Sequence, residues 1–182
     1  KKRQEKCKAK LEQALKAGTK VLDKGGAALD AVIAAVKVLE DSALFNAGKG
    51  SCLTRAGKVE MDAAVMNGSD LNTGAVCGIT REKNPVMAAR AVMELTPHVL
   101  LMGSGADHYF DQIAKEADLK IMPPDYFVTE RAIQGLKRYL DKEKKAKKEG
   151  KAVSGLSTGA SQGEGIPLDL MDFPFDGKYG TV

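Results

Sequence analysis

The fold is decided by residues 51–80, SCLTRAGKVEMDAAVMNGSDLNTGAVCGIT, because the short apolar runs in this stretch are typical of strands. Apolar runs at 51–54 and 59–66 flank the turn-like residues 55–58, and a further short run follows at 74–80. The stretch therefore predicts sheet strands.

Two helices are predicted before these strands. Apolar residues recur at helical spacing from Cys7 to Leu22, and the run ends at Gly25 and Gly26, where a left-handed backbone is easily reached. A second run, residues 29–39, repeats the helical pattern with an acidic residue early in the helix. The two predicted helices form a helical layer.

The chain after residue 80 returns to helices. Asn84 and Pro85 form a typical helix start, with Asn as the cap and Pro in the first turn. The elements predicted from here are a helix at 86–95, a strand at 98–102, a helix at 106–117 and a last helix from 129 to about 140. Strands between helical layers predict a layered α/β sandwich.

The composition describes one ordinary globular unit. Of the 182 residues, 43% are apolar and 29% are charged, which suits a single domain with a hydrophobic core. The three cysteines are too widely spaced for a disulfide framework or a metal site and are predicted to be free thiols. No stretch approaches the ~18 apolar residues of a membrane helix, and no apolar run follows the basic N-terminus. We therefore expect no membrane contact, and the localisation stays open with a slight preference for the cytoplasm.

The positive charge is concentrated in two lysine-rich segments, residues 1–10 and 137–151. Together they carry more positive charge than the net +4 of the whole chain, so the remaining body is acidic. Nucleic-acid binding is not favoured, because aromatic residues make up only 5% and do not interleave with the lysines. The alternative that stays open is a non-catalytic protein that binds an acidic partner or nucleic acid through these segments.

A long linker is predicted near the end of the chain. Residues 149–179 are rich in Gly, Ser and Pro and show no periodicity. A linker of this length inside a compact domain is unusual, and a site at which the chain is cut gives it a reason. The predicted organisation is one domain over 1–140, a flexible linker over 141–180, and the start of a new segment at 181–182.

Thr181, which follows Gly180 at the end of the predicted linker, has chemistry suited to such a cut. A Thr hydroxyl is a weak nucleophile that needs a base, and cleavage before Thr181 supplies one in the new terminal amine, with a pKa of about 8. Gly180 suits its position because a residue without a Cβ tolerates a strained backbone. In the structural alternative, residues 180–182 merely begin a strand.

Three motifs together resemble one enzyme family. They are LEDSALFNAGKG at 39–50, VEMDAAVM at 59–66 and GTV at 180–182. Shorter matches follow in the family's order at 74–76, 84–86, 88–90, 92–94 and 96–98. Over roughly residues 10–140 and the final tripeptide, the chain resembles the large-subunit part of the isoaspartyl peptidase/L-asparaginase family, the plant-type asparaginases.

The resemblance implies a fold, an activity and partners. The implied fold is a four-layer αββα sandwich of the N-terminal-nucleophile hydrolase type, incomplete in this chain. The implied enzyme is a precursor that cleaves itself between Gly180 and Thr181 and then hydrolyses L-asparagine and β-aspartyl dipeptides. We expect the chain to pair with its own C-terminal small subunit, to form a homodimer of such αβ units, and to bind no nucleic acid.

The resemblance also implies functional residues. Thr181 is the expected nucleophile, and Asn46 is expected to stabilise the oxyanion, an interaction worth about 3 kcal/mol. From the residues alone, Asn46 would be interpreted as an Asn that caps a turn. Relatives bind a structural sodium ion through main-chain carbonyls, here those of Leu39, Glu40, Ser42, Phe45, Ala47 and Lys49. No cofactor is expected for catalysis, and residues 92–98 occupy the position of a potassium-sensitive loop that some members use.

The chain also departs from the family pattern. Relatives begin with a strand and a His-Gly-Gly turn, and after the Thr-Val pair they continue with a small subunit that supplies substrate-binding Arg and Asp residues. The chain alone is therefore expected to be inactive. Asn67 stands where many relatives have Asp. Cousins of the family are glycosylasparaginases and threonine endopeptidases, and Gly180 and Val182 favour the asparaginase and isoaspartyl branch instead.

Overall fold

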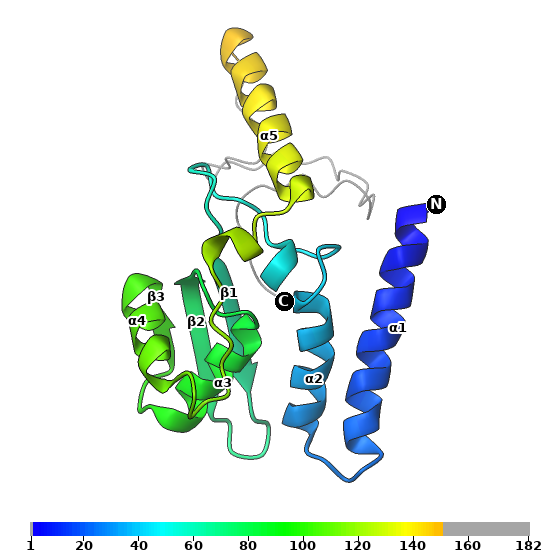
Figure 1. Cartoon of the computed structure of the whole chain (residues 1–182), viewed down its shortest axis with the longest axis vertical. Helices are drawn as coiled ribbons and strands as arrows, with labels where there is room; N and C mark the ends of the chain where they lie inside the picture. The colour runs from blue at the N-terminus through cyan, green and yellow to red at the C-terminus, as the bar shows by residue number, and fades with distance from the viewer. Residues whose placement is uncertain (1, 151–182) are drawn as a thin grey trace.

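The computed structural model of the protein describes residues 2–150. Its elements in chain order are α1 (Lys2–Leu22), α2 (Ala28–Glu40), η1 (Gly48–Gly50), β1 (Met61–Met66), β2 (Thr73–Ile79), α3 (Pro85–Leu95), β3 (Leu100–Met102), α4 (Gly103–Ile113), η2 (Pro124–Tyr126) and α5 (Glu130–Lys148). Helices and strands share one fold, which confirms the predicted α/β class (Figure 1). Within this range no helix is both long and apolar enough to cross a membrane.

The sheet has three strands in the order β1-β2-β3. β1 and β2 are antiparallel, with Met61 opposite Ile79, whereas β3 is parallel to β2. The pairing of β1 and β2 is irregular at Asp62, where the N–H of Gly78 donates to Oδ1 of Asp62 at 2.8 Å. Gly78 has a φ of 64°, which glycine adopts without strain. The displaced backbone N–H is therefore satisfied by a side chain.

Helix α3 packs on one face of this sheet. Ala88 and Val92 of the helix are fully buried and share a core with Val76 of β2. Gly74 of β2 allows the close approach, because a Cβ at this position would lie only 2.1 Å from the carbonyl oxygen of Ala89. The largest fully buried apolar side chains of the core are Phe110, Phe127 and Ile79. The helix and the sheet therefore form two tightly packed layers.

The opposite face of the sheet is exposed within residues 2–150. The register places Leu100 beside Ala75 and Ala75 beside Ala64, so these residues share this face. Along the same face, Met66 is 55% exposed and Met102 is 66% exposed. The hairpin of α1 and α2, seen beside the sheet in Figure 1, also exposes large apolar side chains, namely Leu11, Leu15, Leu22 and Val32.

Residues 51–54 form a loop, so the strand predicted there is wrong. The N–H of Ser51 donates to the carbonyl of Gly48, and the N–H of Cys52 donates to the side chain of Asn46. Because both donors are used inside their own loop, they cannot join a sheet ladder. β1 and β3 start two residues later than predicted, at 61 instead of 59 and at 100 instead of 98, whereas β2 starts one residue earlier, at 73 instead of 74.

The last two long helices also differ from the prediction. α4 begins at Gly103, directly after β3, and ends at Ile113 instead of at residue 117. α5 continues to Lys148, past the domain boundary predicted at residue 140. Its lysine-rich end is held by Glu143, whose carboxylate pairs with Arg55 and Lys147. Residues 141–148 of the predicted linker are therefore helical, and the part from 151 onward lies outside the described residues.

Candidate active site and cation loop

The predicted cation loop follows α2 directly. The helix ends where the N–H of Asp41 donates to the carbonyl of Lys37 at 2.9 Å and the N–H of Ser42 donates to the carbonyl of Leu39 at 3.0 Å. The chain then passes through the short helix η1, where the N–H of Gly50 donates to the carbonyl of Ala47 at 2.9 Å. These local hydrogen bonds give partners to some of the backbone carbonyl groups at the helix end. They also fold residues 39–51 into a compact loop.

The carbonyl groups of this loop turn toward η1. A Cβ at Gly50 would lie 1.9 Å from the carbonyl oxygen of Phe45 and 2.8 Å from that of Ser42. A Cβ at Gly48 would lie 2.5 Å from the carbonyl oxygen of Glu40. Glycine is needed at both positions because any side chain would collide with these oxygens. Three of the six predicted sodium ligands therefore present their carbonyls to the same short helix.

The donor set of the loop fits the expected sodium ion. Across residues 2–150, His, Cys, Asp and Glu side chains form no group of three or more that could hold a metal ion. Carbonyl oxygens are neutral, hard ligands, which suit a hard cation of low charge. The ammonium of Lys49 lies 4.8 Å from the centre of the Tyr126 ring, so only the main chain of Lys49 is a candidate ligand.

Asn46 lies in the middle of the loop with a half-buried side chain. Its Oδ1 accepts the backbone N–H of Cys52 at 2.9 Å, which fixes the oxygen end of the amide. The NH₂ group is the end of the amide that can donate to an oxyanion. The same bond closes the loop between residues six positions apart, so Asn46 also has the structural role considered from the sequence.

Arg131 contacts the loop from the first turn of α5. Its Nη1 donates to the carbonyl oxygen of Ala43 at 3.1 Å and to that of Phe45 at 3.5 Å. Burial lowers the pKa of Arg131, and the positive charges of Arg3 and Arg138 lower it further. Sequence reasoning missed this residue because its partners lie 86 and 88 positions earlier in the chain, and no local signal marks it.

Glu40 connects the loop to α3 through its side chain, which is buried. Its Oε1 accepts the N–H of Val86 at 2.9 Å, next to Pro85, which has no N–H to offer. Burial raises the pKa of Glu40 to about 7, and hydrogen bonds from Val86 and Asn84 act in the opposite direction. From the sequence, only the main-chain carbonyl of Glu40 was expected to have a role, as a sodium ligand. In the structure, the side-chain carboxyl of Glu40 caps α3, the helix that packs on the sheet.

A small cavity of about 20 Å³ lies beside Asn46, with Cys52 and Asp62 in its wall. A space of this size holds about one water molecule, so it cannot take a dipeptide. Gly180 and Thr181 lie outside the described residues, and the structure therefore does not test whether Thr181 meets Asn46.

The cysteines near this cavity are poor nucleophiles. Burial raises the pKa of Cys52, and a hydrogen bond with Asp62 raises that of Cys77. Thiols with raised pKa values stay protonated at neutral pH, and only the thiolate is reactive. Both residues and Cys7 are free thiols, as predicted.

Comparison with known proteins gives a consistent set of relatives. A family model described as asparaginase matches residues 1–182. The isoaspartyl peptidase of Escherichia coli K12 is 39% identical over 172 residues, which cover 94% of this chain and 46% of that protein. The plant-type L-asparaginase of Pyrococcus horikoshii is 50% identical over 132 residues, or 72% of this chain and 41% of that protein. The isoaspartyl peptidase/L-asparaginase of Mus musculus is 43% identical over 142 residues, which cover 78% of this chain and 41% of that protein.

The matched part of the chain spans less than half the length of each of these relatives. The family match, in contrast, extends along the entire chain and includes the motifs at 39–50, 59–66 and 180–182. It confirms the resemblance that these motifs indicated. The chain therefore belongs to the asparaginase family of N-terminal-nucleophile hydrolases, with isoaspartyl peptidases and plant-type L-asparaginases as its relatives.

Proposed function

We propose that the protein is a threonine-nucleophile amidohydrolase that acts on L-asparagine and β-aspartyl dipeptides. The observation that carries this proposal is the family match over residues 1–182, joined by relatives named isoaspartyl peptidase or L-asparaginase at 39% to 50% identity. Both substrate types present the same side-chain carbonyl to a nucleophile. In this proposal, residues 2–150 belong to the large subunit, and a C-terminal small subunit supplies the groups that grip the substrate.

The proposed maturation step is a cut between Gly180 and Thr181. The Thr181 hydroxyl oxygen attacks the Gly180 carbonyl carbon, the C–N bond breaks, and the acyl group moves from nitrogen to oxygen. Water then hydrolyses this ester, which leaves a carboxylate on Gly180 and a free amine on Thr181. The amine subsequently accepts the hydroxyl proton of the same residue when Thr181 attacks a substrate.

Asn46 is the proposed donor to the substrate carbonyl during that attack. The Thr181 oxygen adds to the side-chain carbonyl carbon, and the C–N bond breaks to release ammonia from L-asparagine or the second amino acid from a β-aspartyl dipeptide. Water then releases aspartate from the acyl-enzyme. Negative charge develops on the carbonyl oxygen, where a fixed N–H stabilises it most in a site from which water is excluded. The bond from the Cys52 N–H to Oδ1 of Asn46 supports this role, because it orients the amide in advance.

The proposed architecture is a four-layer αββα sandwich in which a second sheet covers the exposed face of β1, β2 and β3. The apolar side chains on that face, including Met66, Leu100 and Met102, support this arrangement. The second sheet would come in part from the small subunit, and two such αβ units would form a homodimer.

No cofactor is proposed for catalysis. The proposed ion is sodium, held in the cation loop by main-chain carbonyls of Leu39, Glu40, Ser42, Phe45, Ala47 and Lys49. The orientation of the Glu40, Ser42 and Phe45 carbonyls supports this assignment. The sodium ion would hold the loop that carries Asn46 and would take no part in the reaction. Residues 92–98 are a second candidate cation site, which would bind potassium.

Substitution of Thr181 tests the proposed mechanism in the full-length protein. Wild type should separate into two fragments on a denaturing gel, with Thr first in the smaller one, and should release ammonia from L-asparagine. Thr181→Ala should stay a single inactive chain, because it lacks the hydroxyl. Thr181→Ser should be cut and should turn over slowly, since it keeps the oxygen but loses the methyl group that restricts the rotamer. Normal cleavage of the Ala variant would show that another group makes the cut.

A further inference from the structure

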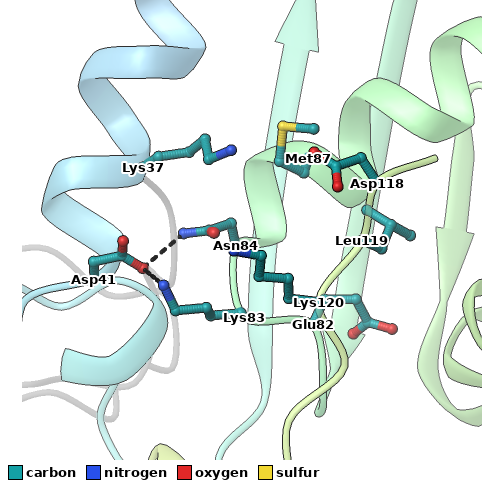
Figure 2. Close-up of a pocket in the computed structure, with 9 residues that line it drawn as sticks. All are labelled: Lys37, Asp41, Glu82, Lys83, Asn84, Met87, Asp118, Leu119 and Lys120. Atoms are coloured by element: carbon teal, nitrogen blue, oxygen red, sulfur yellow. Dashed lines mark hydrogen bonds and ion pairs between the residues drawn. The ribbon is translucent and has the colours of Figure 1, made fainter. Parts of the chain in front are cut away.

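A second cavity, of about 160 Å³, lies between α2, the segment that precedes α3 and the segment that follows α4 (Figure 2). It shares no lining residue with the small cavity beside Asn46. A volume of this size suits a ligand much smaller than a drug molecule, because drug-sized pockets start at about 300 Å³.

The walls of this cavity are fixed by backbone contacts between distant parts of the chain. The N–H of Lys83 donates to the carbonyl of Lys120 at 2.8 Å, and Glu82 and Ile121 form a β-bridge. Asp118 lies at the end of the turn that follows α4, in the left-handed conformation with a φ of 50°. Side chains that lie far apart in the sequence are therefore held around one space.

Part of the charge around the cavity is neutralised internally. Nζ of Lys83 lies 2.6 Å from Oδ1 of Asp41, and the same oxygen accepts from Nδ2 of Asn84 at 3.2 Å. Asn84 is only 7% exposed, so the amide that holds Asp41 is itself part of the packed structure. These three residues form a satisfied polar edge of the cavity.

Three further charges remain without an ion pair. Lys37, Lys120 and Asp118 line the cavity, and none of them takes part in an ion pair within residues 2–150. In the view of Figure 2, the ammonium groups of Lys37 and Lys120 lie on one side of the cavity and the carboxylate of Asp118 lies on the other. The carboxyl of Glu82 points away from this space. The cavity thus presents two unpaired positive charges opposite one negative charge.

We propose that this cavity binds an acidic α-amino acid of the size of L-aspartate. Such a ligand carries two carboxylates, which suit Lys37 and Lys120, and one ammonium group, which suits Asp118. Charge-assisted hydrogen bonds of this kind are stronger than neutral ones. A dicarboxylate without an ammonium group fits less well, because it leaves Asp118 unpaired next to a second negative charge.

The ligand class is inferred from these charges and does not depend on the proposed hydrolysis. L-Aspartate is also the product of asparagine hydrolysis, so the cavity would give the protein a second binding site for its own product. Binding can be measured without any turnover, and the two proposals therefore fail independently.

Calorimetric titration of L-aspartate into the full-length protein tests the contribution of the two lysines. Lys37→Gln and Lys120→Gln should each weaken binding by about tenfold, the effect expected for one lost charged hydrogen bond. Lys115→Gln is the matched control, because Lys115 is exposed and does not line the cavity, and it should bind like wild type. Identical binding by wild type and both cavity variants would place the ligand elsewhere and overturn the proposal. Absence of binding to wild type at millimolar aspartate would do the same.

Asp118→Asn tests the ammonium contact. This variant should bind L-aspartate about tenfold more weakly, whereas succinate, which has no ammonium group, should bind at least as well as it does to wild type. An equal loss for both ligands would show that Asp118 does not recognise the ammonium group, which overturns the assignment of the ligand as an amino acid.

Discussion

Asn46 has one observed contact within its loop and one proposed catalytic function, which a suitable pair of substitutions can separate. Its oxygen closes the cation loop through the Cys52 N–H, and its NH₂ group is the proposed donor to the oxyanion. Asn46→Asp keeps an acceptor for Cys52 but removes the donor, whereas Asn46→Ala removes both. Comparison of the two variants therefore distinguishes the structural function from the catalytic one.

We expect both variants to lower kcat for L-asparagine by about 100-fold in the full-length protein, because both lose the donor. Asn46→Asp should melt near the wild-type temperature, and Asn46→Ala should melt lower because the Cys52 N–H loses its partner. Turnover by ammonia release and melting by circular dichroism measure the two effects. An Asn46→Asp enzyme with near-normal kcat would leave only the structural function.

The motif around Asn46 predicted a loop after α2, and its glycines at positions 48 and 50 let the backbone turn sharply there. The main-chain sodium ligands, which the family resemblance implied, stay a prediction. Two other residues were not predictable at this scale. The Glu40 carboxyl caps α3 at Val86, 46 positions later, and the Arg131 guanidinium reaches Ala43 and Phe45 from α5. Such contacts depend on how complete elements pack, which local patterns do not contain.

Helix α3 approaches strand β2 closely at Gly74. Gly74→Ala should lower the free energy of unfolding by about 3 kcal/mol, since the added Cβ would meet the backbone of Ala89 and Met93 and the helix would have to move. Gly68→Ala is the control, because nothing lies within 4 Å of a Cβ at that position. It should change stability by less than about 0.5 kcal/mol. Urea unfolding measures the free energy of unfolding of both variants. Equal changes in the two variants would show that α3 can shift to accommodate a Cβ at residue 74 without loss of stability.

If the loop at residues 39–51 binds sodium as proposed, the stability of the protein depends on sodium. In the full-length protein, replacement of sodium by choline at constant ionic strength should lower the melting temperature, because an ion that binds only the folded state stabilises it by mass action. Gly50→Ala should abolish this difference, since its Cβ would displace the Phe45 and Ser42 carbonyls. A melting temperature that is the same in both salts would remove sodium from the proposal.

At the scale of elements, sequence patterns predicted helices and strands correctly where the periodicity of apolar side chains decides the structure. The helices before residue 40, the helix that starts at Pro85 and the strand that ends at Met66 were all predicted in type. Residues 51–54 were predicted wrongly because their apolar content suits a strand, whereas the N–H groups of Ser51 and Cys52 donate to the preceding loop. The lysine-rich end of α5 was taken for a linker, since its support comes from Arg55 in a distant loop.

The molecule as a whole carries a buried acid whose titration affects folding. Glu82 is 1% exposed, and burial, with a smaller contribution from the nearby charge of Asp107, raises its pKa to about 7. The folded state therefore binds a proton that the unfolded state releases at about pH 4.3. The stability from this group is complete below that pH and is lost as the pH rises through about 7.

Glu82→Gln should isolate this contribution. The variant should match wild type near pH 4 and become more stable than wild type at pH 8, by up to about 3 kcal/mol. Free energies of unfolding from urea titrations at the two pH values provide the comparison. An equal difference between variant and wild type at both pH values would show that Glu82 titrates normally in the folded protein.

The general architecture was predictable because helices before and after a set of strands leave few packing solutions. The sequence could not show that one face of the sheet stays apolar and uncovered within residues 2–150, with Leu100 50% exposed and Met102 66% exposed. Alternation along a strand indicates which residues share a face, but it does not say what that face packs against.

This uncovered face has a consequence for biosynthesis. Residues 2–150 leave the ribosome before any later part of the chain, so the face around Met66 and Leu100 is displayed while translation continues. Chaperones and proteases recognise exposed apolar patches of this kind, and the face stays accessible to them until the proposed second sheet covers it. Under this proposal, a molecule that lacks the second sheet would be recognised by quality control through the same surface that the complete molecule buries.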